Sequence, residues 1–356
     1  MENIDTAIAA AIENYHELNA AVVDELVEEP SPLEFMQFVS RNRPFVVRKA
    51  ASDWDALKHW DAQYLRRVMG SEPVQVAVTP RGNADAVVED ENGQPLFVQP
   101  HETPEPFNEF LDYVHQDTQC PPEQQNGRNV KYAQTRTSIS PPSPIHLFDD
   151  LPENDNLREE YYSLLPDIPE SIPFARLALE KEPDAINLWI GNERSVTALH
   201  KDNYENIYVQ IRGQKHFVLL SPVEMPCVNE QLLEQARYVP EQESGKLVIE
   251  RSEGGETLPF ATWDPDEPGE RTTPFSHLAK PLKATLEEGD MLYLPAMWYH
   301  KVSQTAGEEG FACAVNAWYD MEFAGGFWTA NSFLRDVMGA ASKVVKYPAL
   351  QMSDER

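Results

Sequence analysis

Cysteine is scarce in this sequence. The three cysteines, Cys120, Cys227 and Cys313, lie far apart among 356 residues, and no two form a C-x-x-C pair. Cysteines spaced in this way build neither a disulfide framework nor a zinc knuckle. This usage is typical of a reducing compartment, so we expect the protein in the cytoplasm or the nucleus.

Membrane-directed segments are also lacking. No apolar run approaches the ~20 residues that a membrane-spanning helix needs. The first residues, MENIDTAIAAAIENYHELN, are acidic and amphipathic rather than basic and then apolar, so we expect no signal peptide. The membrane is therefore excluded as a partner.

Basic residues are few. Lysine and arginine together number 29, against 59 aspartates and glutamates, which gives a formal net charge of −30. A field of this sign repels nucleic acid and anionic membranes, so neither is expected as a partner. It attracts a basic protein or peptide, although an acidic surface that merely keeps a protein soluble is the commoner explanation. The sequence leaves open whether the chain forms a homodimer.

The first third of the chain mixes helical and strand patterns. Apolar residues at helical spacing predict one amphipathic helix from about Asn3 to Val27. Ser31 as N-cap, with Pro32 just inside, begins a second, short helix. Two strands are then expected, in RPFVVRKA and in PVQVAVTP, the second closed by a turn at residues 80–83.

The pattern changes at Ala185. Residues from about 141 to 173 are rich in Pro, Asp and Glu and are expected to be mostly irregular. After Ala185, turn residues separate short aromatic and β-branched runs: INLWIG, YENIYVQI, KHFVLLSP, DMLYLP and FACAVNAWYD. This pattern predicts an antiparallel barrel or jelly roll rather than a βαβ protein.

The sequence suggests a division into three parts. They are an N-terminal α/β region (1–128), a β core (129–320) and a C-terminal helical segment (321–356). A chain of this length exceeds what one hydrophobic core usually fills, so flanking regions are expected. A polar insert from about 229 to 282 interrupts the core, either as a functional rim or as a disordered loop.

The strongest local motif is VTALHKDNYENIYVQIRGQKHF. His200 and Asp202 lie two residues apart, so on an extended strand both side chains leave the same face. A neutral imidazole and a carboxylate on one face supply two of the three ligands of a 2-His-1-carboxylate metal site. An H-x-D tripeptide also occurs by chance, and an ordinary surface pair is the alternative.

A lysine stands in the apolar strand that ends this motif. If Arg212-Gly213 forms a hairpin turn, Gln210 faces Lys215, and Tyr208 is its diagonal neighbour. A lysine in a half-buried strand requires an anionic partner, because burying its charge alone is costly. That partner is either a ligand carboxylate or a structural Asp or Glu.

The third metal ligand must come from another segment. His300, in EEGDMLYLPAMWYHKV, follows a strand and an aromatic loop and is the best candidate. His216 directly follows Lys215, faces the opposite way, and is not expected to be a ligand. The remaining histidines fall in helices or polar loops and are treated as surface or packing residues: His16, His59, His101, His115, His146 and His277.

Several segments, in order, carry a family resemblance. They are NRPFVVRKA, VQVAVTPRGNADAV, PDAINLWIG, VTALHKDNYENIYVQIRGQKHF, GDMLYLPAMWYHKV and VNAWYDME. Through them most of the chain resembles the small, JmjC-only hydroxylases among the cupin-like 2-oxoglutarate oxygenases. The acidic insert and an extra GEEGF are departures, and both are expected to fall in loops. The resemblance implies a mainly β fold, with a double-stranded β-helix (jelly-roll) core, a flanking α/β region and C-terminal helices.

The resemblance also implies roles for particular residues. His200, Asp202 and His300 match the iron ligands, and Lys215 matches the lysine that pairs with the far carboxylate of 2-oxoglutarate. Further co-substrate positions are matched by Thr197, Asn206, Asn316, Tyr132 and Tyr208. Positions facing the protein substrate are matched by Gln134 and Trp318, and Asp85 is our candidate for a carboxylate that faces a basic side chain. Core packing is the alternative for Tyr208 and Trp318, and capping of the turn after Gly82 is the alternative for Asp85.

The activity implied is that of an Fe(II)- and 2-oxoglutarate-dependent protein hydroxylase that consumes O2 and forms succinate and CO2. Three protein ligands leave three positions on an octahedral iron, enough for a bidentate 2-oxo acid and dioxygen. The favoured target is a lysine in a developmentally regulated GTP-binding protein. Two rivals remain, a metal-dependent peptidase that clips basic tails and a non-catalytic cupin-like binding module. The sequence has no H-E-x-x-H helix, which disfavours the peptidase.

Overall fold

The N-terminal helix is shorter than predicted. The computed structural model describes residues 2–125, 127–134, 155–252 and 254–342, and in it α1 spans Glu2–Leu18. Residues Asp24–Leu26 instead form β1, which pairs in parallel with β2 (Phe45–Val47). The prediction of a helix to Val27 was therefore wrong in its last third, because pairing with a strand distant in sequence outweighs local periodicity.

The next elements agree with the sequence. Helix α2 (Pro32–Arg41) begins at Ser31, whose hydroxyl accepts from the Glu34 amide while the Glu34 carboxylate accepts from the Ser31 amide. This reciprocal capping satisfies two amides that a helix start leaves unpaired. The predicted strands are confirmed as β2 and β3 (Pro73–Thr79).

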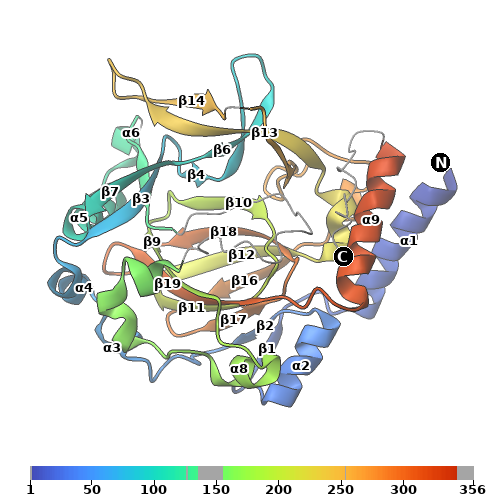
Figure 1. Ribbon diagram of the computed structural model, residues 1–356, viewed down its shortest axis with the longest axis horizontal. Helices are drawn as coiled ribbons and strands as arrows, with labels where there is room; N and C mark the ends of the chain where they lie inside the picture. Colours follow the sequence, from blue (N-terminus) through green and yellow to red (C-terminus); the bar gives the residue numbers. More distant parts are fainter. Residues whose placement is uncertain (1, 126, 135–154, 253, 343–356) are drawn as a thin grey trace, which may run out of the picture.

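Two sheets form the core, as the predicted jelly roll requires (Figure 1). The first has the order β1-β2-β17-β11-β19-β9, with β9 at Ala185–Gly191, β11 at Tyr204–Arg212, β17 at Met291–Leu294 and β19 at Ala312–Asp320. The second has the order β16-β12-β18-β10-β4, with β4 at Asn83–Ala84, β10 at Val196–His200, β12 at Gln214–Leu220, β16 at Leu282–Leu286 and β18 at Tyr299–Thr305. All five predicted β runs are confirmed as strands.

Both faces of the first sheet are covered. Along β11, Ile207 and Val209 join a core cluster with the N-terminal helices, while Tyr208 joins a second cluster with Phe217 and Leu292 between the sheets. A strand buried on both faces carries a near-continuous apolar run. Asn206 alternates with Ile207 along β11 and therefore points, like Tyr208, into the space between the sheets.

The predicted hairpin at Arg212-Gly213 is wrong. Strands β11 and β12 belong to different sheets, so Gln210 pairs with Ala314, and Lys215 pairs with Leu286 and Gln304. Gly213 (φ 67°) makes the crossing between the sheets, and a Cβ there would lie 2.5 Å from the Thr305 carbonyl oxygen. A jelly roll exchanges strands between its two sheets, and local sequence does not reveal that choice of partner.

The polar insert is ordered, which corrects the expectation that it falls in a loop. It forms β13 (Glu230–Pro240), β14 (Leu247–Arg251) and β15 (Thr257–Ala261). Strand β13 pairs in parallel with β6 (Pro95–Gln99), which also pairs with β5 (Ala86–Glu89). Apolar residues of β13, β14 and β15 pack against residues of β6, so a polar composition does not exclude regular strands here. The extra GEEGF does lie in a turn, between β18 and β19.

Shorter elements surround these sheets. A small sheet has the order β7-β3-β8, with β7 at His101–Pro106 and β8 at Val130–Tyr132. The described part of the segment predicted to be irregular holds α7 (Asn156–Glu159) and η2 (Tyr162–Asp167), while residues 141–154 lie outside the described residues. The other helices are α3 (Asp55–His59), α4 (Ala62–Met69), α5 (Phe107–Thr118), α6 (Pro122–Gln125), α8 (Pro173–Leu179), η3 (Pro222–Cys227), η4 (Ser276–Leu278) and α9 (Gly326–Ser342).

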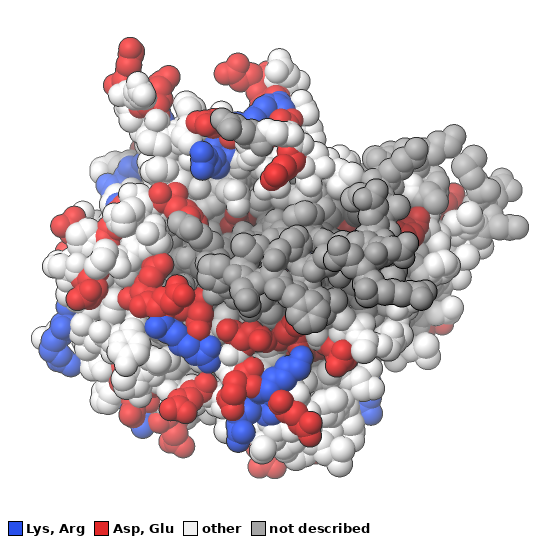
Figure 2. Space-filling model, viewed as in Figure 1, with Lys and Arg blue, Asp and Glu red and all other residues white. Residues whose placement is uncertain are grey.

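The predicted C-terminal helical segment (321–356) is confirmed over α9, which lies beside α1 (Figure 1). Residues 343–356 of this segment lie outside the described residues. Both helices contact η3. Among the described helices, none is both long and apolar enough to cross a membrane. Acidic side chains outnumber basic ones over the face shown in Figure 2, in line with the net charge of −30.

Candidate metal centre

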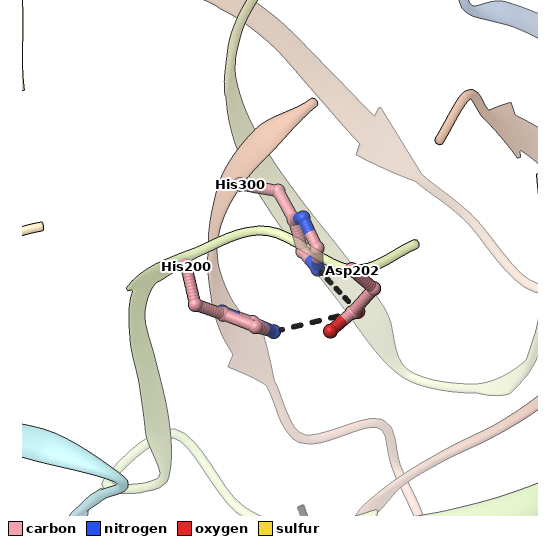
Figure 3. Close-up of side chains that lie close together, drawn as sticks. All are labelled: His200, Asp202 and His300. Atoms are coloured by element: carbon pink, nitrogen blue, oxygen red, sulfur yellow. Dashed lines mark ion pairs between the residues drawn. The ribbon is translucent and has the colours of Figure 1, made fainter. Parts of the chain in front are cut away.

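Three side chains converge at one end of the second sheet. His200 is the last residue of β10, Asp202 follows in the turn, and His300 lies opposite His200 on β18. The Asp202 Oδ2 atom is 3.7 Å from His200 Nε2 and 3.6 Å from His300 Nε2 (Figure 3). One ligand atom from each residue lies within 4.8 Å of the others, which is the spacing of a site that can hold a metal ion. The structure thus brings together the three residues predicted to be ligands.

The imidazoles are held in a form that suits a metal. His200 Nδ1 lies 2.8 Å from the Ala198 carbonyl oxygen, and His300 Nδ1 lies 3.0 Å from that of Trp298. A carbonyl only accepts, so each Nδ1 carries the proton, which leaves the Nε2 lone pairs facing Asp202. Burial, together with the neighbouring His200, lowers the pKa of His300 to about 4. His300 is therefore neutral near pH 7, as a metal ligand must be.

The backbone around the site is constrained. The Met297 amide donates to the Asp202 carbonyl oxygen at 2.8 Å, and Met297 holds a positive φ of 68° although it is not glycine. The Met321 amide donates to the Asn203 carbonyl oxygen at 3.0 Å. Two loops distant in sequence therefore fix the turn that carries Asp202.

Each histidine of the cluster is followed by a lysine that forms an ion pair with the insert. Lys201 forms an ion pair with Glu230, and Lys301 binds Asp264 and Asp266 at 2.7 and 2.6 Å. Burial raises the pKa of Glu230, but the charges of Lys201 and of Arg335 on α9 lower it by more. The net effect is a pKa of about 2, so Glu230 is ionised. The insert thus clamps both strands that carry the histidines. Local pattern along the chain does not predict these ion pairs, because the partners lie about 30 or more residues apart.

Lys215 lies deep between the sheets and is only 2% exposed. Its Nζ donates to the Tyr132 hydroxyl at 2.8 Å, and within the described residues no carboxylate forms an ion pair with it. Burial lowers the pKa of Lys215 to about 7 and raises that of Tyr132, which stays a neutral hydroxyl. A buried cation that lacks a structural counter-ion fits a carboxylate that arrives with a ligand.

Gly191 permits this arrangement. A Cβ there would collide with the Tyr132 ring and would lie 2.7 Å from Gln304 Nε2. Strand β9 can therefore approach Tyr132 closely only because residue 191 has no side chain. The sequence offered one signal that was missed, a glycine inside a strand pattern.

Two of the predicted co-substrate residues form an amide chain. Trp189 Nε1 donates to Asn316 Oδ1 at 2.7 Å, and Asn316 Nδ2 donates to Asn206 Oδ1 at 3.0 Å. This bond orients the Asn206 side chain through its Oδ1, so that its Nδ2 can donate to another group. Thr197 lies on β10 opposite Val302, one ladder step from the histidine pair.

The remaining predicted residues are placed as follows. The Tyr208 ring packs edge-on against Phe217 with centroids 5.1 Å apart, and Trp318 stacks on Tyr204 at 4.8 Å. Asp85 is buried, and its Oδ2 accepts from Gln134 Nε2 at 3.0 Å. The Thr79 hydroxyl accepts from the Gly82 amide at 2.8 Å and closes the turn that ends at Gly82.

A jelly roll with a His-Asp-His cluster at one end and a buried lysine between its sheets defines the cupin-like class. Residues 30–325 match the family described as "Cupin-like domain". The chain belongs to this family, within its JmjC group, and the family resemblance and fold predicted from sequence are both confirmed.

Particular relatives narrow this further. The Bifunctional peptidase and (3S)-lysyl hydroxylase JMJD7 of Homo sapiens is 37% identical over 302 residues, 85% of each chain. The Lysine-specific demethylase JMJ32 of Arabidopsis thaliana is 34% identical over 310 residues, 85% of this chain and 82% of its own. JmjC domain-containing protein E of Dictyostelium discoideum is 31% identical over 318 residues, 84% of each chain. The protein is therefore a JmjC-only protein similar to JMJD7.

Proposed function

We propose that this protein is an Fe(II)- and 2-oxoglutarate-dependent hydroxylase that modifies a lysine in a basic protein segment. The observation that carries the proposal is the environment of Lys215. This buried lysine donates to the Tyr132 hydroxyl and lies in the same barrel as the His-Asp-His cluster. A dicarboxylate that binds metal at one end and needs a cation for the other fits both features. JmjC relatives use this pair of iron and 2-oxoglutarate, and the residues present here fit it.

His200, Asp202 and His300 would hold the metal, and three protein ligands leave three positions open. Bound together, iron, 2-oxoglutarate and dioxygen supply the oxidation: one oxygen atom enters succinate as CO2 leaves, and the other enters the substrate C–H bond. The protein contributes binding, orientation and exclusion of water. Lys215, the Tyr132 hydroxyl and Thr197 would bind the far carboxylate, and the Asn206 amide would bind near the metal.

The substrate residues are assigned by chemistry. A cationic side chain that enters the barrel needs a carboxylate other than Asp202, which the metal occupies. Asp85, held by Gln134, is our candidate, and Trp318 would form an aromatic wall. The target protein is proposed to be a GTP-binding protein, and the acidic surface favours a basic segment of it.

The names of two relatives state other activities. The human relative is named as a peptidase as well as a hydroxylase, and the Arabidopsis relative as a demethylase. The described cluster holds one carboxylate, Asp202, and a peptidase would need a further carboxylate as general base. We therefore favour hydroxylation over peptide cleavage as the activity.

The test is a turnover assay with Fe(II), 2-oxoglutarate and a panel of lysine-containing basic peptides, read by mass spectrometry. Hydroxylation predicts a peptide heavier by one oxygen atom and an equal amount of succinate. Cleaved peptides without succinate would support the peptidase. Loss of a methyl group from a methylated peptide would support the demethylase, and absence of metal binding would support the binding module.

A further inference from the structure

Asn187 is a buried amide that makes no hydrogen bond within the part of the chain that the structure describes. It lies on the inner face of β9, since its neighbours Ile186 and Leu188 face the opposite way, into the core beneath the N-terminal helices. Its exposed fraction is 0%, and neither its Oδ1 nor its Nδ2 makes a hydrogen bond among the described residues. Buried amides are nearly always bonded, because an unmade bond forfeits solvation without compensation.

The register places Asn187 beside the amide chain of the site. Asn187 lies opposite Asn316 on β19, and Asn316 lies opposite Tyr208 on β11. Both polar atoms of Asn316 already have partners, in Trp189 and Asn206. Asn187 therefore faces the space between the sheets at the level of the predicted co-substrate residues.

A second unpartnered group lies on the same wall. Trp318 follows Asn316 by two residues, so both side chains leave the same face of β19, and Trp318 Nε1 is buried without a hydrogen bond in the described chain. Among the described residues, two buried N–H donors on this sheet therefore have no acceptor. A ligand rich in acceptors would satisfy them.

The free edge of β9, the last strand of its sheet, gives the contrast. Asn156, on α7, is also buried, but its Nδ2 donates to the Leu188 carbonyl oxygen at 3.0 Å, and its Oδ1 accepts from the Leu188 amide at 2.7 Å. Both polar atoms of Asn156 therefore have a partner. Among the described residues, neither polar atom of Asn187 has one.

We propose that Asn187 is a further co-substrate-binding residue, whose Nδ2 donates to a carboxylate oxygen of the 2-oxo dicarboxylate lying between the metal cluster and Lys215. This inference rests on the proposed function. A dicarboxylate offers only acceptors, which matches the unpartnered N–H donors of this sheet.

The experiment compares Asn187→Leu with Asn156→Leu, two buried amides, one on β9 and the other on α7, where it binds the β9 backbone. Each protein is loaded with Mn(II), which binds without turnover, and titrated calorimetrically with 2-oxoglutarate. Asn187→Leu is expected to raise the 2-oxoglutarate Kd roughly ten- to hundredfold, the range for a hydrogen bond to a charged group. Its Mn(II) affinity without 2-oxoglutarate should equal that of the wild type.

Thermal unfolding of the metal-free proteins separates this role from a structural one. Asn187→Leu should unfold at the wild-type temperature or above, because it removes an unmade hydrogen bond, whereas Asn156→Leu should unfold lower. If leucine does not fit, Asn187→Ala removes the amide without added volume and should show the same rise in Kd.

An unchanged 2-oxoglutarate Kd in Asn187→Leu and Asn187→Ala would overturn the inference, whether or not stability or peptide affinity changes. Failure of the wild-type Mn(II) protein to bind 2-oxoglutarate would instead remove the proposed function on which the inference rests.

Discussion

At the scale of single residues, Asp202 has one role. Its carboxylate contacts the two histidine ligands, and no hydrogen bond joins it to another described side chain. Its backbone carbonyl, which holds the turn, does not depend on the side chain. Function and stability are therefore separable at this position.

Asp202→Ala should consequently lose the metal and keep the fold. We expect the Mn(II) Kd to rise by more than about hundredfold, because even partners outside the ligand set contribute 10–100-fold. Calorimetric titration with Mn(II) and thermal unfolding of the metal-free protein measure the two effects. Asp266→Ala, an exposed acidic residue near the site, is the control and should bind Mn(II) normally. Normal metal binding by a folded Asp202→Ala protein would remove the triad.

Lys215 makes co-substrate binding depend on pH. Burial lowers its pKa to about 7 in the free protein, and a bound carboxylate requires the ammonium form. Below pH 7 the ammonium is already present, so the 2-oxoglutarate Kd should be nearly constant. Above it, binding must take up a proton, so the Kd should rise about tenfold per pH unit until the pH reaches the higher pKa of the bound form.

Lys215→Met tests this assignment. Loss of one partner of a buried ion pair costs about 3–5 kcal/mol, or roughly two to three decades in Kd. The variant should bind 2-oxoglutarate correspondingly more weakly at pH 7 and should lack the rise at higher pH, as measured by calorimetry on the Mn(II) protein. A wild-type Kd in the variant would make Lys215 a structural lysine.

Much of the site could be predicted one residue at a time. The H-x-D spacing and a lysine in an apolar strand are local signals, and the structure gathers His200, Asp202 and His300. Asn187 and Gly191 were missed although each interrupts the run INLWIG. Their meaning depends on which strand or side chain lies opposite, which spacing along one strand does not encode.

At the scale of elements, the strands were predictable and their partners were not. Short aromatic and β-branched runs bounded by turn residues predicted β11 and β12, but the expected hairpin between them was wrong because each strand pairs elsewhere. The insert was misread for the same reason: β13 looks polar alone and gains its apolar partner, β6, from a distant segment. Tertiary pairing therefore supplied what local pattern lacked.

The clamp from the insert gives an element-scale prediction. Glu230→Gln leaves Lys201 without its buried carboxylate, so the free energy of unfolding should fall by about 3–5 kcal/mol. Glu234→Gln, on the same strand, breaks a more exposed ion pair with Arg251 and should cost about 0–1 kcal/mol. Denaturant unfolding of the two variants measures the difference. Equal small losses would mean that the clamp contributes nothing to stability.

At the scale of the whole molecule, the net charge of −30 bears on how a substrate arrives. Acidic side chains dominate the face shown in Figure 2. Attraction over such a surface acts mainly on the association rate, and salt screens it. The alternative, that the charge only keeps the protein soluble, predicts no such dependence.

We expect association of a basic peptide to slow as salt rises, because the Debye length falls from about 10 Å at 0.1 M to about 3 Å at 1 M. Stopped-flow measurements at several salt concentrations test this, with the target lysine intact and with norleucine in its place. The norleucine peptide should associate more slowly and should not turn over. Salt-independent association with equal turnover of both peptides would leave the charge as a solubility feature.

We propose that this JmjC protein oxidises its substrate with dioxygen and 2-oxoglutarate. The most direct test is turnover of a basic peptide under isotopically labelled dioxygen in ordinary water, read by mass spectrometry. We expect one labelled oxygen atom in the peptide and one in succinate, in equal amounts, and no labelled product from Asp202→Ala. Product oxygen drawn from water, or peptide cleavage without labelled succinate, would contradict it.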